Sequence, residues 1–145
     1  MGTAHIEGEI VIERSVEDVF DFVADERNEP RYNPRMLRAE KLSQGPIGVG
    51  SQFRAEFSSF RRPVATSELT EYERPRRLAS RTHMSAMDVR GTLTFDPVPA
   101  GTRMRWSWYL EPRGIFKLMT RLVTRIGRRQ EEAIWASLKR ILEGE

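Results

Sequence analysis

The stretch 115–142, IFKLMTRLVTRIGRRQEEAIWASLKRIL, decides the expected architecture. Apolar residues recur in it at spacings of three and four, which is typical of one face of an α-helix. Much of the other face is basic. About 28 residues at roughly 1.5 Å each predict a helix about 42 Å long. Such a helix cannot bury its apolar face alone, so the rest of the chain must supply a surface for it. The apolar positions are Ile115, Leu118, Met119, Leu122, Val123, Ile126, Ala133, Ile134, Leu138 and Leu142.

The chain before this helix shows strand periodicity, interrupted once. Residues 5–13 alternate as a half-buried strand does. A helix over 15–25 follows, with Ser15 as its N-cap, and then a short helix or turn around 26–31. Six further strands are predicted, at 37–43, 51–60, 63–73, 76–84, 88–97 and 102–112.

The order of these elements predicts an antiparallel sheet, because short turns join its last six strands. With one strand before the helices, we expect the first and last strands to meet and the sheet to curve around the long helix. A cavity between sheet and helix is expected. Residues 115–126 are assigned to its cover and entrance, and 133–142 to packing.

The composition of the chain argues against several classes of protein. The chain has 145 residues, 31% of them charged, no cysteine and a net charge of +3, which suits one soluble domain over 1–145. No segment is long enough to span a bilayer and no signal peptide is visible, so a cytoplasmic location is expected. The pI near 9.7 reflects arginine rather than a large excess of charge, so nucleic acid is not predicted as a partner.

Four segments resemble a known superfamily. They are IVIERSVEDVFDFVAD at 10–25, TEYERPRRL at 70–78, GTLTFDPVPAGTRMRW at 91–106 and the closing helix. Together with the element order, they are similar to the START/Bet v 1-like (SRPBCC) superfamily, in its polyketide cyclase/dehydrase and lipid-transport branch. The resemblance implies an α+β helix-grip fold, in which a curved seven-stranded antiparallel sheet wraps a long C-terminal helix. It also implies a deep apolar cavity. Tyr32 stands where relatives often carry Trp, and we expect a packing substitution.

A ligand pocket is predicted from the residues that face inward in this arrangement. Whether they pack against the helix or line an open cavity stays open, because both environments use the same residue types. The predicted pocket residues are Phe53, Phe57, Leu69, Leu93, Phe95, Trp106, Trp108, Phe116, Met119, Leu122, Val123 and Ile126.

Candidates for catalysis are few: His83, Tyr32, Tyr72 and Glu68. If Leu78 points inward, His83 points outward, unless a bulge near 74–77 reverses the register. The expected exposed side also carries Arg54, Arg81, Arg90 and Arg105. No triad, zinc or nucleotide motif occurs, so no cofactor and no metal are expected.

Three functions remain open. Carriage of a hydrophobic small molecule is favoured, and a polyketide cyclase or dehydratase is the alternative. A protein-interaction module is the third. The basic group at 121–129 is either a solvated face or a transient contact with anionic lipid. Ligand identity and oligomeric state are not encoded in these patterns.

Overall fold

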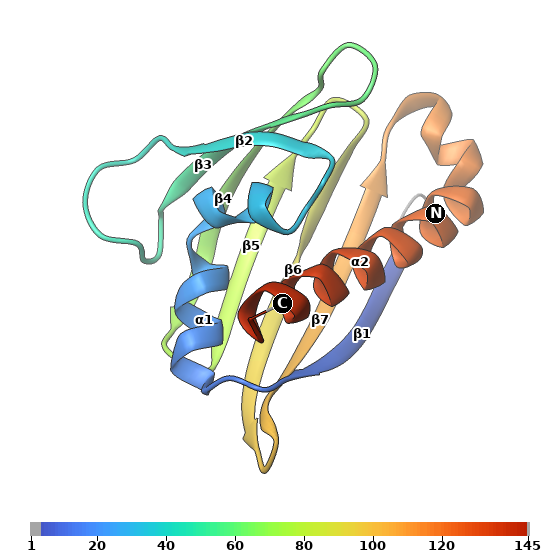
Figure 1. The fold of residues 1–145 in the computed structure, drawn as a ribbon. Helices are drawn as coiled ribbons and strands as arrows, with labels where there is room; N and C mark the ends of the chain where they lie inside the picture. Colours follow the sequence, from blue (N-terminus) through green and yellow to red (C-terminus); the bar gives the residue numbers. More distant parts are fainter. Residues whose placement is uncertain (1–3, 145) are drawn as a thin grey trace.

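The computed structural model describes residues 4–144, which form one seven-stranded antiparallel sheet with helices on its inner side (Figure 1). The strand order is β1-β7-β6-β5-β4-β3-β2. The strands are β1 Ala4–Ile12, β2 Met36–Lys41, β3 Gln52–Phe57, β4 Val64–Glu73, β5 Arg77–His83, β6 Met87–Val98 and β7 Gly101–Pro112. The helices are α1 Val16–Ala24, the 3-10 helices η1 Glu26–Arg31 and η2 Gly114–Met119, and α2 Thr120–Leu142.

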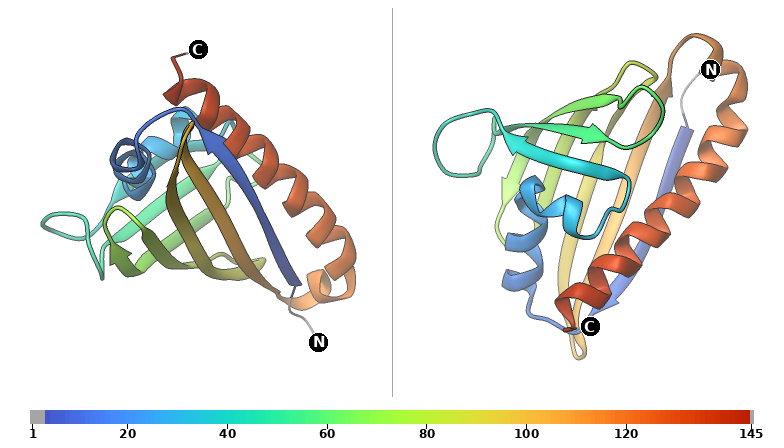
Figure 2. Two further views of the ribbon diagram at one scale, coloured as in Figure 1. Left: turned by 90° about the horizontal axis from the view of Figure 1, so that it is seen from below. Right: turned by 45° about the horizontal axis from the view of Figure 1, so that its top comes forward.

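The sheet is a meander that is completed by its first strand. Strands β2 to β7 each pair with their neighbour in sequence, and β1 pairs with β7 from Ala4–Leu110 to Ile12–Thr102. The expected meeting of the first and last strands is therefore confirmed. The sheet is strongly curved (Figure 2), and α1, η1 and α2 lie on its concave side. Alternation puts Leu93, Phe95 and Trp106 on this inner side, where all three are buried.

The predicted helix after β1 is confirmed as α1. Its N-cap is Ser15, whose hydroxyl accepts a hydrogen bond from the Asp18 backbone N–H at 3.2 Å. Val19 and Phe20 on its inner face are fully buried, and the Phe20 ring meets the Phe95 ring edge-on. The short helix expected around 26–31 is η1, which packs against β2.

The C-terminal helix differs from the prediction in two ways. Residues 115–119 belong to the 3-10 helix η2, so the α-helix starts at Thr120 rather than at 115. Its apolar residues also do not share one face. Leu138 is fully buried, whereas Leu122 is 50% and Ile126 45% exposed. Each four-residue step advances about 400° around a helix, so repeated steps rotate the stripe by about 40° each. Leu122 and Leu138 consequently lie on nearly opposite sides of α2.

Gly127 marks the place where α2 comes close to the sheet. A Cβ atom at this position would lie 3.5 Å from Ile6 and 3.6 Å from Leu110. At this position the helix therefore lies directly against β1 and β7.

The edge strands of the sheet are β1, which α2 contacts, and β2, which is short. Along β1, Lys139 of α2 donates from Nζ to the backbone carbonyl of Val11 at 2.8 Å. At the other edge, β2 has six residues, carries exposed Arg38 and Glu40, and shifts register between Met36 and Arg38.

Candidate functional site

Three glutamates converge on the inner side of the sheet. Glu26 and Glu29 come from η1, which packs against β2, and Glu131 comes from α2, which packs along β1. The carboxylate of Glu26 accepts a hydrogen bond from the Ser67 hydroxyl on β4. Asn33 Nδ2 donates to Glu29 Oε2 at 3.0 Å. The cluster therefore joins elements from both sides of the concave face.

Two indoles hold the carboxylate of Glu131. Trp108 Nε1 on β7 donates to Glu131 Oε1 at 2.6 Å, and Trp135 Nε1 donates to the same oxygen at 3.1 Å. Trp135 lies one turn further along α2 and is buried. Hydrogen bonds to an ionised acceptor are among the stronger ones, so this carboxylate ties α2 to the sheet.

Burial gives these carboxyl groups unusual proton affinities. Burial raises the pKa of Glu26 to about 7, with a further increase from the charge of Glu29. Burial also raises the pKa of Glu29 to about 7, against the opposing hydrogen bond from Asn33, and the charge of Glu131 raises it further. The pKa of Glu131 is raised by burial and lowered in part by the two indole donors. Near neutral pH, Glu26 and Glu29 can each donate or accept a proton.

Tyr32 lies beside this cluster. Its side chain is buried, and its ring packs between Phe22 and Trp135, with centroid distances of 6.0 and 5.8 Å. This surrounding is that of a packing residue, as expected for its position in the sequence. Burial raises the pKa of Tyr32 well above its usual value, and the nearby glutamate charges act in the same direction. The phenol therefore keeps its proton near neutral pH.

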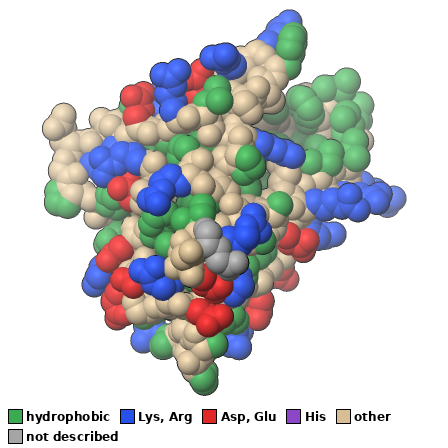
Figure 3. All heavy atoms as spheres, in the orientation of Figure 1, with side chains coloured by type: hydrophobic (Ala, Val, Ile, Leu, Met, Phe, Trp, Pro, Cys, Tyr) green, Lys and Arg blue, Asp and Glu red, His purple; other side chains and the backbone are tan. Residues whose placement is uncertain are grey.

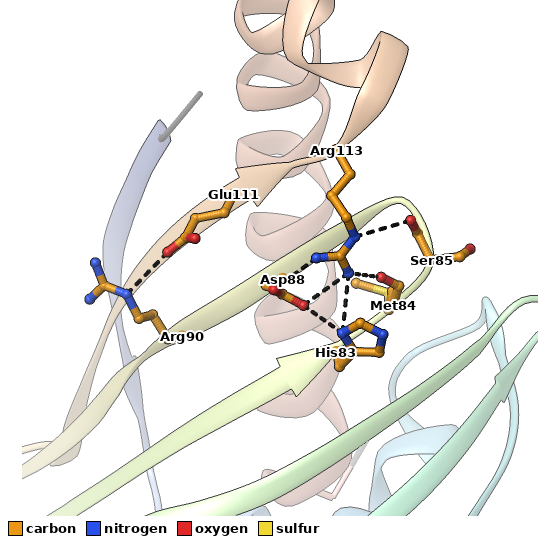
Figure 4. A network of polar contacts seen from close by, with 7 residues as sticks. All are labelled: His83, Met84, Ser85, Asp88, Arg90, Glu111 and Arg113. Atoms are coloured by element: carbon orange, nitrogen blue, oxygen red, sulfur yellow. Dashed lines mark hydrogen bonds and ion pairs between the residues drawn. The ribbon is translucent and has the colours of Figure 1, made fainter. Parts of the chain in front are cut away.

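His83 lies on the opposite, outer side of the sheet. Leu78 is buried and His83 is exposed, which is the facing expected from alternation without a bulge. Its Nδ1 lies 2.8 Å from Asp88 Oδ1, and Arg113 Nη1 lies 2.8 Å from Asp88 Oδ2. Figure 4 shows this network in front of the strands, with α2 behind them. The Arg113 hydrogen bond, assisted by His83, lowers the pKa of Asp88 to about 2.

The other two candidates for catalysis are separated by the sheet. Glu68 faces outward opposite Arg81, where a hollow of about 590 Å³ is lined mainly by outward-facing residues, His83 and Arg90 among them. Tyr72 faces inward, and its ring meets Phe20 edge-on. The structure therefore brings Tyr32 near the half-buried glutamates but leaves His83 and Glu68 on the outer face.

The predicted pocket residues fall into three groups by exposure. Five are buried in the main hydrophobic cluster together with Trp135 and Leu138, namely Phe53, Leu69, Leu93, Phe95 and Trp106. Phe57, Trp108 and Val123 are half-buried. Phe116, Met119, Leu122 and Ile126 are 37–50% exposed, along η2 and the first half of α2.

The sequence prediction missed the three glutamates, because glutamate is usually exposed. Glu131 follows closely after the basic group at 121–129 in the sequence. Its spacing from Trp135 was an unused signal, since residues four apart share a helix face. For Glu26 and Glu29 the sequence offers no such signal. Among residues 4–144, no group of three or more His, Asp or Glu side chains is arranged to hold a metal ion.

Comparisons with known proteins agree on the fold. The family model described as "Polyketide cyclase / dehydrase and lipid transport" matches residues 3–143. Among curated protein sequences, none matches this chain.

Three solved structures illustrate the likeness. TTHA0849 from Thermus thermophilus is 17% identical, with a TM-score of 0.81 over 96% of this chain and 97% of that one. The di-domain ARO/CYC StfQ from the steffimycin biosynthetic pathway is 10% identical, with a TM-score of 0.80 over 97% of this chain and 51% of that one. Ara h 8.0201 is 11% identical, with a TM-score of 0.77 over 99% and 100%. At these identities the likeness establishes the helix-grip fold.

Proposed function

Because the chain belongs to the polyketide cyclase/dehydrase and lipid transport family, we propose that it binds a hydrophobic small molecule on the inner side of the sheet, against α2. The observation that carries this proposal is the carboxyl cluster of Glu26, Glu29 and Glu131 among aromatic side chains. A few convergent polar groups with perturbed pKa values in apolar surroundings are typical of small-molecule sites.

The cluster also limits the chemistry of the ligand. A carboxyl group with a pKa of about 7 can donate or accept a hydrogen bond, which suits a hydroxyl, phenol or keto group. A carboxylate on the ligand would add a negative charge beside Glu131 and is disfavoured. The expected ligand is therefore apolar and uncharged, with one or two oxygen functions, as in a polyketide, a sterol or a hydroxylated lipid.

Half-buried inner-face residues on β4 and β5 mark where the ligand would lie. Ser67 and Thr82 face each other across the two strands and keep part of their surface accessible. We assign the apolar wall to Leu93, Trp106 and Trp108, which follow on the neighbouring strands β6 and β7.

Native mass spectrometry of the gently purified chain, with uptake of the neutral dye Nile red, tests the proposal. Thr82→Trp places a large side chain on the inner face and is expected to reduce uptake. Thr94→Trp makes the same change on the outer face of β6 and serves as the matched control. A chain that neither retains nor takes up an apolar molecule, or one in which both variants behave like wild type, contradicts the proposal.

Catalysis of cyclisation or dehydration is the second candidate. The observation that favours it is the pair Glu26 and Glu29, because a general acid or base works best with a pKa near the operating pH. Glu26→Gln and Glu29→Gln keep the shape of each side chain and remove its proton exchange. If the chain turns over a polyketide substrate, each change is expected to reduce the rate at least about a hundredfold. Unchanged turnover in both variants excludes this role for the pair.

A further inference from the structure

Three connections lie together at one end of the sheet. Strands β3, β5 and β7 all end there, and the antiparallel register keeps these ends level. The loop 58–63, the turn 84–86 and the segment 113–122 therefore share this end. Figure 1 and the right view of Figure 2 show the β3–β4 loop and η2 at the same end of the molecule.

Large apolar side chains are exposed on this end. Phe60 in the β3–β4 loop is 85% exposed, and Leu118 on η2 is 87% exposed. Ile115 is 67% and Leu122 50% exposed. Figure 3 shows hydrophobic side chains gathered where η2 and the start of α2 lie, with Lys and Arg side chains next to them. A single exposed apolar residue needs no explanation, but a group of them marks an interaction surface.

Basic residues are direct neighbours in sequence of three of these four apolar residues. Arg61 and Arg62 follow Phe60, while Lys117 and Arg121 precede Leu118 and Leu122 directly. We call these eight residues the docking surface: Phe60, Arg61, Arg62, Ile115, Lys117, Leu118, Arg121 and Leu122. Both loop arginines have positive φ angles, 67° and 44°, which non-glycine residues rarely adopt. The loop thus places two arginines directly after its exposed aromatic residue, at some cost in backbone conformational energy.

Charge is distributed unevenly between this end and the rest of the chain. The segments 58–63, 84–86 and 113–122 contain five basic and no acidic residues. Because the whole chain carries +3, the remainder carries −2. The end that exposes apolar side chains is therefore the positive end of the molecule. Apolar residues interspersed with Lys and Arg are the combination that binds the interface of an anionic membrane.

We propose that the docking surface binds the surface of an anionic lipid bilayer, with Phe60 and Leu118 entering the headgroup region. Within residues 4–144, none of the helices combines the length and the apolar character that a membrane span requires. Each basic residue near the headgroups adds attraction that salt screens, and each inserted side chain adds apolar burial that salt does not screen. The inference does not depend on the small-molecule ligand proposed above, because bilayer binding needs no ligand.

Co-sedimentation with lipid vesicles tests this surface in the full-length chain without added ligand. The chain is expected to bind vesicles of phosphatidylcholine with about 30% phosphatidylglycerol, about tenfold or more tightly than vesicles of phosphatidylcholine alone. Raising NaCl from about 0.1 to about 0.5 M should release it. Lys117→Glu with Arg121→Glu should weaken binding to the anionic vesicles about thirtyfold or more. Phe60→Ser with Leu118→Ser should weaken it about tenfold.

Matched variants separate this surface from general effects of charge and hydrophobicity. Arg140→Glu reverses a charge at the other end of α2, and Val49→Ser removes an exposed apolar residue from the β2–β3 loop at the opposite end of β3. Both should bind like wild type, and circular dichroism checks that every variant is folded. Absence of binding to anionic vesicles overturns the proposal, and is the result expected if an acidic protein were the partner. Equal loss in the control variants overturns it as well.

Discussion

Replacing Glu29 with Gln is expected to stabilise the protein at alkaline pH and to leave it unchanged in acid. Glu29 Oε2 accepts a hydrogen bond from Asn33 at 3.0 Å, and a glutamine carbonyl can accept the same bond. Glutamine therefore reproduces the protonated carboxyl in shape and in neutrality. It does not reproduce the ionised form, which is the form that burial disfavours.

The size and sign of the effect follow from the proton affinity. The pKa of Glu29 rises from 4.5 to about 7 on folding. At about 1.4 kcal/mol for each factor of ten, ionisation in the folded protein costs up to about 3 kcal/mol. The folded state holds the proton more tightly than the unfolded chain, so its stability is full below pH 4.5 and falls as pH rises to about 7. Glu26, with a pKa also about 7, loses stability in the same window.

Urea denaturation from about pH 4.5 to about 8.5, followed by tryptophan fluorescence, measures this difference. The free energy of unfolding of Glu29→Gln should equal that of wild type near pH 4.5 and exceed it by up to about 3 kcal/mol at about pH 8. Glu132→Gln, an exposed neighbour of the cluster on α2, is the control and should follow wild type throughout. If wild type and Glu29→Gln give parallel pH profiles, Glu29 is not desolvated and the reasoning fails.

Three further substitutions probe other parts of the fold. Leu138→Ala removes a fully buried side chain of α2 and should lower the free energy of unfolding by about 2–5 kcal/mol, measured by urea denaturation. Asp88→Asn breaks an exposed ion-pair network, so the free energy of unfolding should fall by less than about 1 kcal/mol at about pH 7. Because the pKa of Asp88 is lowered to about 2, thermal melts of variant and wild type should converge as pH falls to about 2. Gly91→Ala would place a Cβ against the backbone carbonyl of Ser107. We expect the free energy of unfolding, measured by denaturation followed with circular dichroism, to fall by about 3 kcal/mol or more, or the chain not to fold.

The sheet could be predicted from sequence because its determinants are local. Strand periodicity assigned Phe95 and Trp106 to the inner side, and both are buried. The cap at Ser15 needs only its own helix turn. The two faces of α2 could not be separated in this way, since a three- and four-residue pattern rotates slowly and only contact with the sheet shows where burial stops.

The candidate site could be predicted less well from the sequence than the fold. The outward facing of His83 followed from Leu78 by simple alternation. The carboxyl cluster depends on η1, β4 and α2 meeting, and Glu29 and Glu131 lie about a hundred residues apart in the chain. A glutamate that becomes half-buried through such contacts cannot be told from an exposed one in the sequence, so only the structure distinguishes them.

The structure of the two edge strands affects how this chain can associate with other chains. An unpaired strand edge is a template on which another chain can add a strand, and it is a common start of aggregation. Here Lys139 occupies a free carbonyl of β1, while β2 is short, charged and shifted in register beside Met36. The β2 edge therefore offers no long row of regular hydrogen-bonding groups, and α2 packs against β1 at the other edge. Contacts between copies of this chain, or with other proteins, are therefore directed to side-chain surfaces rather than to extension of the sheet.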